Sequence, residues 1–276
     1  MGVRTDLAIE QSEIKGKLPD GVTLEKYTNG DVKVTKIVVS NEEAGKTLGK
    51  PCGKYITAEV KGAIDGALSD IIKTELCELL PKNGSVLVVG LGNEGITPDS
   101  LGPKCAAGVI ATRHISEQMT SDNGLAVLRS VEVISPGVLG QTGIETAEII
   151  SGIAARTAPA AVLAIDALAS RRLYRLGNTV QMTDTGISPG SGVGNSRTEI
   201  SEKTIGIPVI ALGVPTVVDA ATLMFDLRSE MNGEQMMITP REIDTIINRA
   251  ADTISHAINC ALQPEYDPEV LRAAMM

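Results

Sequence analysis

Aromatic residues are nearly absent from this chain: they make up 2% of its 276 residues, with one Phe and no Trp. Proteins that bind single-stranded nucleic acid stack the bases on aromatic side chains, so this composition argues against such a surface. The formal net charge of −9 also disfavours a basic face that would bind phosphates. We therefore expect no direct contact with nucleic acid.

Histidine and paired cysteines, which build many metal sites, are scarce as well. The chain has two His and four Cys. No CxxC pair and no Cys/His spacing typical of a metal site occurs. We therefore expect buried free thiols in a reducing compartment, with neither metal nor cofactor; the residues concerned are Cys52, Cys77, Cys105, Cys260, His114 and His256.

Long apolar runs are also missing. No stretch of eighteen apolar residues occurs, so no membrane-spanning helix is expected. The residues that follow Met1 lack the apolar run of a signal peptide. The sequence predicts a soluble, cytoplasmic protein without a membrane contact.

The first sixty residues are rich in β-prone segments. Two such runs within residues 22–39 flank Asn29-Gly30, which is a strong signal for a tight hairpin. Residues 55–60 alternate in the manner of a third strand. We expect a small β-rich addition over residues 7–60.

From about residue 61, segments with helical periodicity alternate with apolar runs. This alternation predicts an α/β fold with a mainly parallel, twisted sheet sandwiched by helices. No linker is visible, so we expect a single domain over residues 1–276, with an α/β core over residues 61–276. The expected strands are 86–89, 126–134, 160–165, 178–183 and 207–212; the expected helices are 64–83, one following Pro103, 144–155, 216–230 and 240–262.

Carboxylates stand in the segments that follow the predicted strands. Asp99 lies in GLGNEGITPDSLGP after the first apolar run, and Asp166 comes directly after the run 160–165. Asp184 and Asp219 follow the next two strands. Ligands of open α/β sheets bind beyond the carboxyl ends of the strands, so we expect these loops to meet at one edge of the sheet.

Each of these features also has a structural interpretation. Asp99 could cap a helix, and Asp184 and Asp219 could simply form turns. Gly90-Leu91-Gly92 after a strand resembles a dinucleotide fingerprint only weakly. The segment 189–195 lacks the Lys of a phosphate loop, and no His accompanies a Ser in these loops, which disfavours a serine triad.

An aspartate pair remains the favoured chemistry. Two carboxyl groups within a few ångströms cannot both ionise easily, so one of them keeps its proton. The ionised group can activate a water, while the protonated group polarises the peptide. Asp99 and Asp166 are the candidates for this pair.

The same loops resemble those of the germination protease family of endospore-forming bacteria. The resemblance runs from about residue 86 to 220, with shorter matches near both ends. The matching segments, in order, are RTDLAIE, VVGLGNEGITPDSLGP, SPGVLGQTGIETAEII, AIDALASR, DTGISPGSGVGNSR, IPVIALGVPTVVDA and ITPREID.

This resemblance implies an atypical aspartic endopeptidase with a fold similar to that of hydrogenase maturation proteases. Its substrates would be small acid-soluble spore proteins, and its place the spore core. The family's catalytic positions, in the TPD and IDAL motifs, correspond to Asp99 and Asp166. The resemblance further implies a zymogen and a homotetrameric active form.

The N-terminus fits the zymogen interpretation. Residues 5–10 read TDLAIE and are similar to the motif at which family substrates are cut. We expect self-cleavage between Asp6 and Leu7, which makes residues 1–6 a pro-segment; alternatively, these residues merely begin the fold. This pro-segment would be short for the family, and the segment between Asp219 and Thr239 also looks shortened.

Two other functions remain open at this point. One is a metal-dependent maturation peptidase of the same fold, although neither histidine is an evident ligand. The other is a binding domain in which the carboxylates have no catalytic role. Loss of activity on chelation would favour the first, and full function without Asp99 and Asp166 would favour the second.

Overall fold

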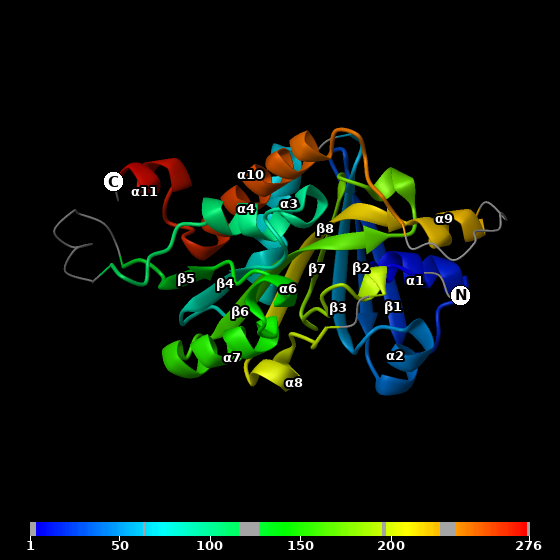
Figure 1. Ribbon diagram of the computed structural model, residues 1–276, viewed down its shortest axis with the longest axis horizontal. Helices are drawn as coiled ribbons and strands as arrows, with labels where there is room; N and C mark the ends of the chain where they lie inside the picture. Colours follow the sequence, from blue (N-terminus) through cyan, green and yellow to red (C-terminus); the bar gives the residue numbers. More distant parts are fainter. Residues whose placement is uncertain (1–3, 63, 116–126, 195–196, 227–235, 275–276) are drawn as a thin grey trace.

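The computed structural model describes residues 4–62, 64–115, 127–194, 197–226 and 236–274. Figure 1 shows one twisted sheet with helices on both faces, which confirms the predicted α/β class. The strands are β1 (Val22–Asn29), β2 (Val32–Val39), β3 (Gly53–Val60), β4 (Val86–Gly90), β5 (Val131–Ile134), β6 (Ala161–Ser170), β7 (Thr179–Thr183), β8 (Val209–Asp219) and β9 (Met237–Ile238).

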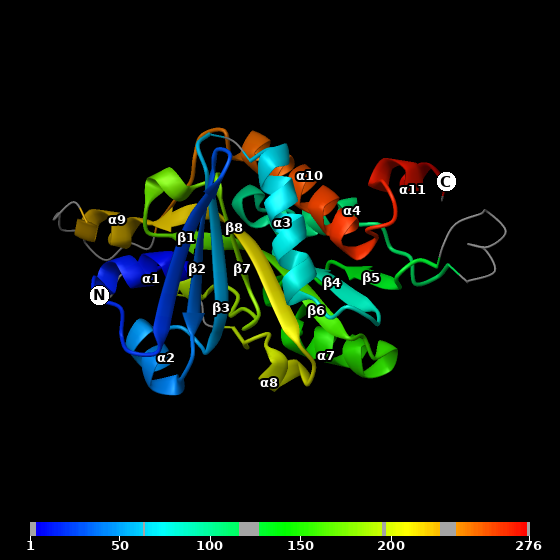
Figure 2. The ribbon, with the colours of Figure 1, turned by 180° about the vertical axis from the view of Figure 1, so that it is seen from behind.

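The helices cover the sheet on both faces. On one face α3, α4 and α10 pack together, and Figure 2 shows them from behind. On the other face α7 lies beside the parallel strands, and α1 and α2 lie beside β1 to β3 (Figure 1). The helices are α1 (Ala8–Lys15), α2 (Glu42–Leu48), α3 (Gly66–Leu79), α4 (Leu101–Gly108), α6 (Leu139–Thr142), α7 (Thr146–Thr157), α8 (Glu202–Ile205), α9 (Ala220–Asp226), α10 (Ile243–Leu262) and α11 (Pro268–Ala274).

The sheet is mixed rather than mainly parallel. Its described strands follow the order β1-β2-β3-β7-β8-β6-β4-β5, with β9 paired to the end of β8. The strands β8, β6, β4 and β5 pair in parallel, whereas β1, β2, β3 and β7 pair antiparallel. The tight turn after Asn29 explains part of this result, because a short hairpin can join only antiparallel strands.

The β-rich beginning is continuous with the rest of the sheet. The predicted hairpin is confirmed, with Asn29 opposite Val32 and a positive φ of 58° at Gly30. β3 then pairs with β7, so the first three strands extend the sheet instead of forming a separate layer. The segment 7–60 also contains α1 and α2, which the β-rich pattern did not indicate.

Two apolar layers follow from the alternation of side chains along each strand. On β6, Leu163 and Ile165 join the cluster beneath α3, α4 and α10, whereas Val162 and Ala164 face α7. The helix α10 contributes an apolar face at 3.6-residue spacing to the first layer; its members are Ile243, Ile247, Ala250, Ile254, Ile258 and Ala261. A third cluster lies between α1, α2 and the first strands.

Several element boundaries differ from those expected. The helix α3 ends at Leu79, before Asn83-Gly84, and α4 begins at Leu101, so Pro103 lies within its first turn, where a missing N–H costs nothing. β5 covers only the end of the expected strand 126–134, and residue 126 lies outside the described residues. The helix expected over 216–230 is α9, since residues 216–219 belong to β8 and residues 227–230 lie outside the described part.

A buried cluster of charged side chains around Arg175 connects α1 to the residues that follow β6. The Arg175 guanidinium, 2% exposed, bonds Glu10 (Nη1 to Oε1, 3.1 Å), Glu13 (Nη2 to Oε1, 2.6 Å) and Glu59 (Nε to Oε1, 2.9 Å). Glu10 is fully buried and also accepts the backbone N–H groups of residues 171 and 172. The N–H of Arg4 also bonds the Thr222 hydroxyl at 3.2 Å, so the N-terminal segment is part of the folded body from residue 4 onward.

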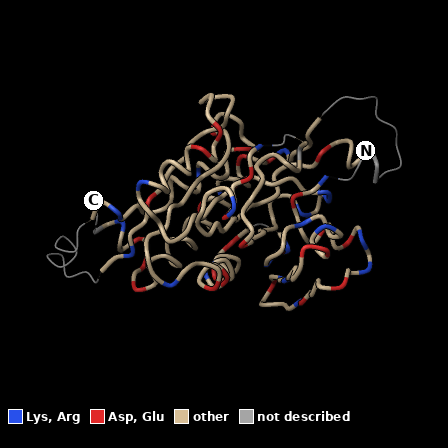
Figure 3. The backbone as a smooth tube through the Cα atoms, turned by 90° about the horizontal axis from the view of Figure 1, so that it is seen from below, with Lys and Arg blue, Asp and Glu red and all other residues tan. Residues whose placement is uncertain are grey.

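Charged residues are otherwise distributed over the whole chain. Figure 3 shows Lys and Arg positions interspersed with Asp and Glu positions along the backbone. In the described part of the chain, no helix combines the length and the apolarity needed to cross a membrane.

Candidate active site

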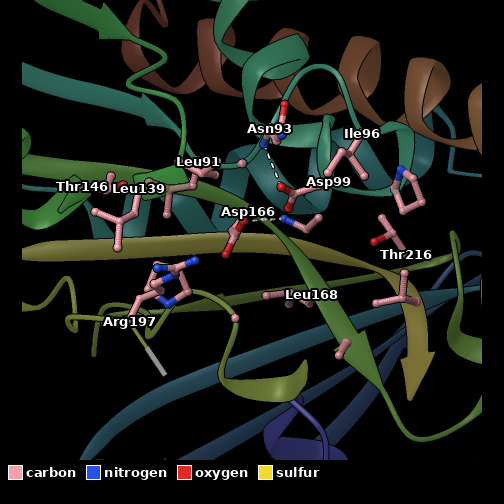
Figure 4. Close-up of a pocket in the computed structure, with 18 of the residues that line it drawn as sticks. Leu91, Asn93, Ile96, Asp99, Leu139, Thr146, Asp166, Leu168, Arg197 and Thr216 are labelled. Carbon is pink, nitrogen blue, oxygen red and sulfur yellow. Dashed lines mark hydrogen bonds between the residues drawn. The ribbon is translucent and has the colours of Figure 1, made fainter. Parts of the chain in front are cut away.

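A cavity of about 440 Å³ opens at the carboxyl ends of β4 and β5, beside the second half of β6. Its walls come from the loop after β4, the loop after β5, the end of β8 and the glycine-rich segment near residue 190. Asp99 and Asp166 both line it, and Figure 4 shows their carboxyl groups in the same part of the cavity. The predicted meeting of these two residues at one edge of the sheet is therefore what the structure shows.

Asp99 is fixed by the loop that carries it. It ends a short 3-10 turn (Thr97–Asp99), and its Oδ2 accepts the backbone N–H of Asn93 at 2.7 Å. The loop closes tightly because Gly92, with φ of 115°, has no side chain: a Cβ there would lie 2.1 Å from the carbonyl oxygen of Asp99. The half-buried Asp99 carboxyl is thus held in place by backbone geometry.

Asp166 lies within β6 and not in a loop after it. The strand continues to Ser170 because residues 166–170 pair with β8. Asp166 is 5% exposed, and its Oδ1 accepts the N–H of Ala167 at 2.9 Å. By alternation its side chain projects on the face of Val162 and Ala164, into the cavity.

Both carboxyl groups hold their protons more tightly than usual. Burial raises the pKa of Asp166 well above its ordinary range, and the nearby charges of Asp99 and Asp6 raise it further. Burial also raises the pKa of Asp99, although the N–H of Asn93 opposes this shift. The more enclosed Asp166 is consequently the group that keeps a proton, and Asp99 the one that ionises first.

A third carboxylate, from the N-terminal segment, reaches the same cavity. Asp6 lines it, although 160 positions separate it from Asp166 along the chain. Asp6 Oδ2 accepts the N–H of Ala169 at 2.8 Å, and Asp6 Oδ1 accepts the hydroxyl of Ser191 at 2.8 Å. Its neighbour Leu7 is fully buried in the cluster beneath α1 and α2.

Asp184 and Asp219 have structural roles in this fold. Asp184 accepts the N–H of Lys54 at 2.7 Å and does not line the cavity. Asp219 ends β8 and accepts both the N–H (2.9 Å) and the hydroxyl (2.8 Å) of Thr222 at the start of α9. Asp219 thus has the turn-forming role that the sequence also allowed, whereas Asp184 connects its loop to the start of β3.

Other residues of the cavity were not singled out from the sequence. Arg197 lies beyond Asp166 as seen from Asp99 (Figure 4). Glu145, directly before α7, also lines the cavity. Arg197 ends the glycine-rich segment 184–197, and its place in that loop was the available signal. Among the described residues, no group of three or more His, Cys, Asp or Glu side chains is arranged to hold a metal ion.

The glycines after β4 keep the spacing of a dinucleotide fingerprint at positions 90, 92 and 95. Their surroundings give them a different role. A Cβ at Gly90 would lie 2.2 Å from the carbonyl oxygen of Gly102, and Gly92 meets Asp99. These glycines allow β4, its loop and α4 to pack closely, which positions Asp99.

Comparison with known proteins agrees with the motifs in these loops. The model of a peptidase family described as germination protease matches residues 4–231. The germination protease from Caldanaerobacter subterraneus subsp. tengcongensis is 41% identical to this chain, in an alignment that covers 96% of this chain and 95% of that protein. The germination protease from Clostridium tetani is 43% identical, in an alignment that covers 98% of both chains. A [NiFe] hydrogenase maturation protease, HycI from Thermococcus kodakarensis, aligns with a TM-score of 0.40 and 15% identity over 67% of this chain and 98% of its own. On the strength of the family match and of the two germination proteases, this endopeptidase belongs to the germination protease family.

Proposed function

We propose that this endopeptidase degrades small acid-soluble spore proteins during spore germination, by attack of a water that the pair Asp99 and Asp166 activates. The observation that carries this proposal is that both aspartates of the family's motifs line one cavity and have raised pKa values. In keeping with the resemblance, we place the enzyme in the spore core and expect its active form to be a homotetramer.

The different burial of Asp99 and Asp166 assigns the roles of base and acid to the two carboxyl groups. Ionised Asp99 takes a proton from the water as the water oxygen attacks the scissile carbonyl carbon. Protonated Asp166 donates its proton to the carbonyl oxygen, which gives a neutral tetrahedral diol. When the C–N bond breaks, Asp99 passes its proton to the leaving nitrogen and the diol returns a proton to Asp166, so both groups regain their starting state.

Cleavage of a purified small acid-soluble spore protein, with and without EDTA, tests the proposal. We expect cleavage at the same rate in both conditions, because the roles above use only carboxyl groups and water. Loss of cleavage with EDTA and its return on adding a divalent metal would support the alternative, a metal-dependent maturation peptidase of the same fold. No cleavage in either condition would contradict the proposed substrate.

We also propose that the chain is made as a zymogen that cuts itself between Asp6 and Leu7. In support, the carbonyl oxygen of Asp6 accepts Lys50 Nζ at 2.7 Å and Gln181 Nε2 at 3.1 Å, which polarises that peptide bond. The segment contacts Ala169, three residues beyond Asp166 and thus about 10 Å further along the strand. Cleavage therefore requires the segment to shift along β6 or to enter the cavity of a second copy.

Mass spectrometry of the N-terminus follows this step directly. We expect the purified full chain to acquire a new N-terminus at Leu7 as activity appears. Mixing the Asp166→Asn chain with wild type separates the two routes, since only cutting between copies processes the variant. A fully active enzyme that still begins at Met1 or Gly2 would overturn the zymogen proposal.

A further inference from the structure

The strand β8 is irregular where it passes the cavity. Its residues pair one to one with β6 as far as Pro215, opposite Leu168, but the next β6 residue, Ala169, pairs with Val217. Thr216 is therefore the extra residue of a β-bulge, which is rare between parallel strands. Because bulges next to active sites redirect a side chain, this irregularity draws attention to the side chain of Thr216.

The backbone holds the bulge in place, and the Thr216 hydroxyl is not needed for this. The carbonyl oxygen of Thr216 accepts the Thr239 hydroxyl at 2.9 Å, and that of Pro215 accepts the N–H of Gly177 at 2.9 Å. Thr216 is 1% exposed, yet its hydroxyl has no hydrogen-bond partner among the residues that the structure describes. A buried hydroxyl without a partner costs stability, and valine would fill the same space without that cost.

The Thr216 side chain belongs to the cavity of the two aspartates. It lines this cavity together with Asp99 and Asp166, and Figure 4 shows it on the side of Asp99, opposite Arg197. Asp99 uses its Oδ2 to accept the N–H of Asn93, whereas no described residue donates a hydrogen bond to its Oδ1. One carboxylate oxygen and one hydroxyl of the same cavity are thus left to bind a small polar molecule.

We propose that the Thr216 hydroxyl takes part in cleavage by orienting the attacking water. The water donates one hydrogen bond to Asp99 Oδ1, which removes that proton during the attack, and a second one to Thr216 Oγ1. The second hydrogen stays on the oxygen and becomes part of the diol. With both hydrogens held, a lone pair of the water points at the scissile carbonyl carbon. This inference rests on the proposed endopeptidase function, in which Asp99 is the base.

The kinetics of full-chain variants with a purified small acid-soluble spore protein test this role. Thr216→Val should lower kcat about 10-fold or more and leave KM near its wild-type value, because a poorly oriented water slows the attack without weakening substrate binding. Thr216→Ser keeps the hydroxyl and should retain most of kcat. Thr216→Val should also melt at a higher temperature than wild type, since its methyl group needs no hydrogen-bond partner.

Thr35→Val is the matched control. Thr35 is fully buried in β2, its hydroxyl likewise lacks a partner within the described part of the chain, and it does not line the cavity. This variant should also melt at a higher temperature but keep wild-type kcat. A wild-type kcat for Thr216→Val, or an equal loss for Thr216→Val and Thr216→Ser, would overturn the role of the hydroxyl while the protease function stands. If the wild-type enzyme leaves the spore protein uncut, the proposed function itself fails.

Discussion

Replacing Asp166 by Asn should lower kcat for cleavage of a spore protein or peptide about 10³-fold, and Asp99→Asn should do the same. General acid and base groups each contribute about 10²- to 10⁴-fold. An amide can neither protonate the scissile carbonyl oxygen nor take a proton from water. Initial rates at saturating substrate measure the effect.

Asp184→Asn is the control for this pair, since Asp184 does not line the cavity and its carboxylate accepts the backbone N–H of Lys54. It should retain wild-type kcat. If the Asp99 and Asp166 variants are folded and cut normally, the pair is not the catalytic centre.

The difference in stability between wild type and Asp166→Asn should depend on pH. The pKa of Asp166 is raised in the folded chain, and that of an unfolded Asp is about 3.9. Wild type therefore loses stability as the pH rises from about 3.9 through the folded pKa, and does not regain it above. At pH 7 Asp166→Asn should melt at a higher temperature than wild type, whereas near pH 3 the difference should vanish; an equal difference at both pH values would contradict the raised pKa.

Arg175→Met should lower the free energy of unfolding by about 3–5 kcal/mol, as removal of one partner from a buried ion pair does. Glu10, fully buried, would lose the guanidinium that lies 3.1 Å from it, and Glu59 would lose a bond of 2.9 Å. Methionine keeps most of the side-chain volume, so the decrease in the free energy of unfolding measures the effect of removing the guanidinium charge. Denaturant unfolding monitored by circular dichroism measures it.

Two further variants make this measurement specific. Arg156→Met removes an exposed arginine of α7 and should change stability by less than about 0.5 kcal/mol. The double variant Arg175→Met with Glu10→Gln should recover part of the loss, because the buried charge is gone. A loss for Arg175→Met no larger than that for Arg156→Met would mean that the cluster contributes no net stability.

The α/β class and the Asp99–Asp166 site could be read from local patterns, because apolar runs mark buried strands and their carboxyl ends converge. The position of Asp166 within a strand, and not in a loop, could not be predicted in this way. Whether residues 166–170 form a loop or a strand depends on pairing with β8, about fifty residues later in the chain. The hairpin of β1 and β2 was predicted, but the antiparallel pairing that joins it to the rest of the sheet escaped prediction for the same reason, since β3 finds β7 more than a hundred residues away.

Asp6 shows the limit of motif reading most clearly. Its place in TDLAIE indicated a cleavage site, but nothing nearby in the sequence indicates contacts with Ala169 and Ser191. Those contacts arise because the cluster around Arg175 fixes α1 against the end of β6. Side chains of many separate segments must be in place before Asp6 can reach the cavity.

Beyond Ile165, β6 has no neighbouring strand on one edge within the described residues, because β4 ends at Gly90 opposite Ile165. On that edge the Ala169 carbonyl accepts the N–H of Asp6 at 2.9 Å, much as strand addition holds an extended peptide. A substrate segment can lie along this edge only after it has left any helix or sheet of its own. The free energy of local unfolding in the substrate then adds to the barrier for cleavage, so we expect well-folded proteins to be cut more slowly than chains without stable structure.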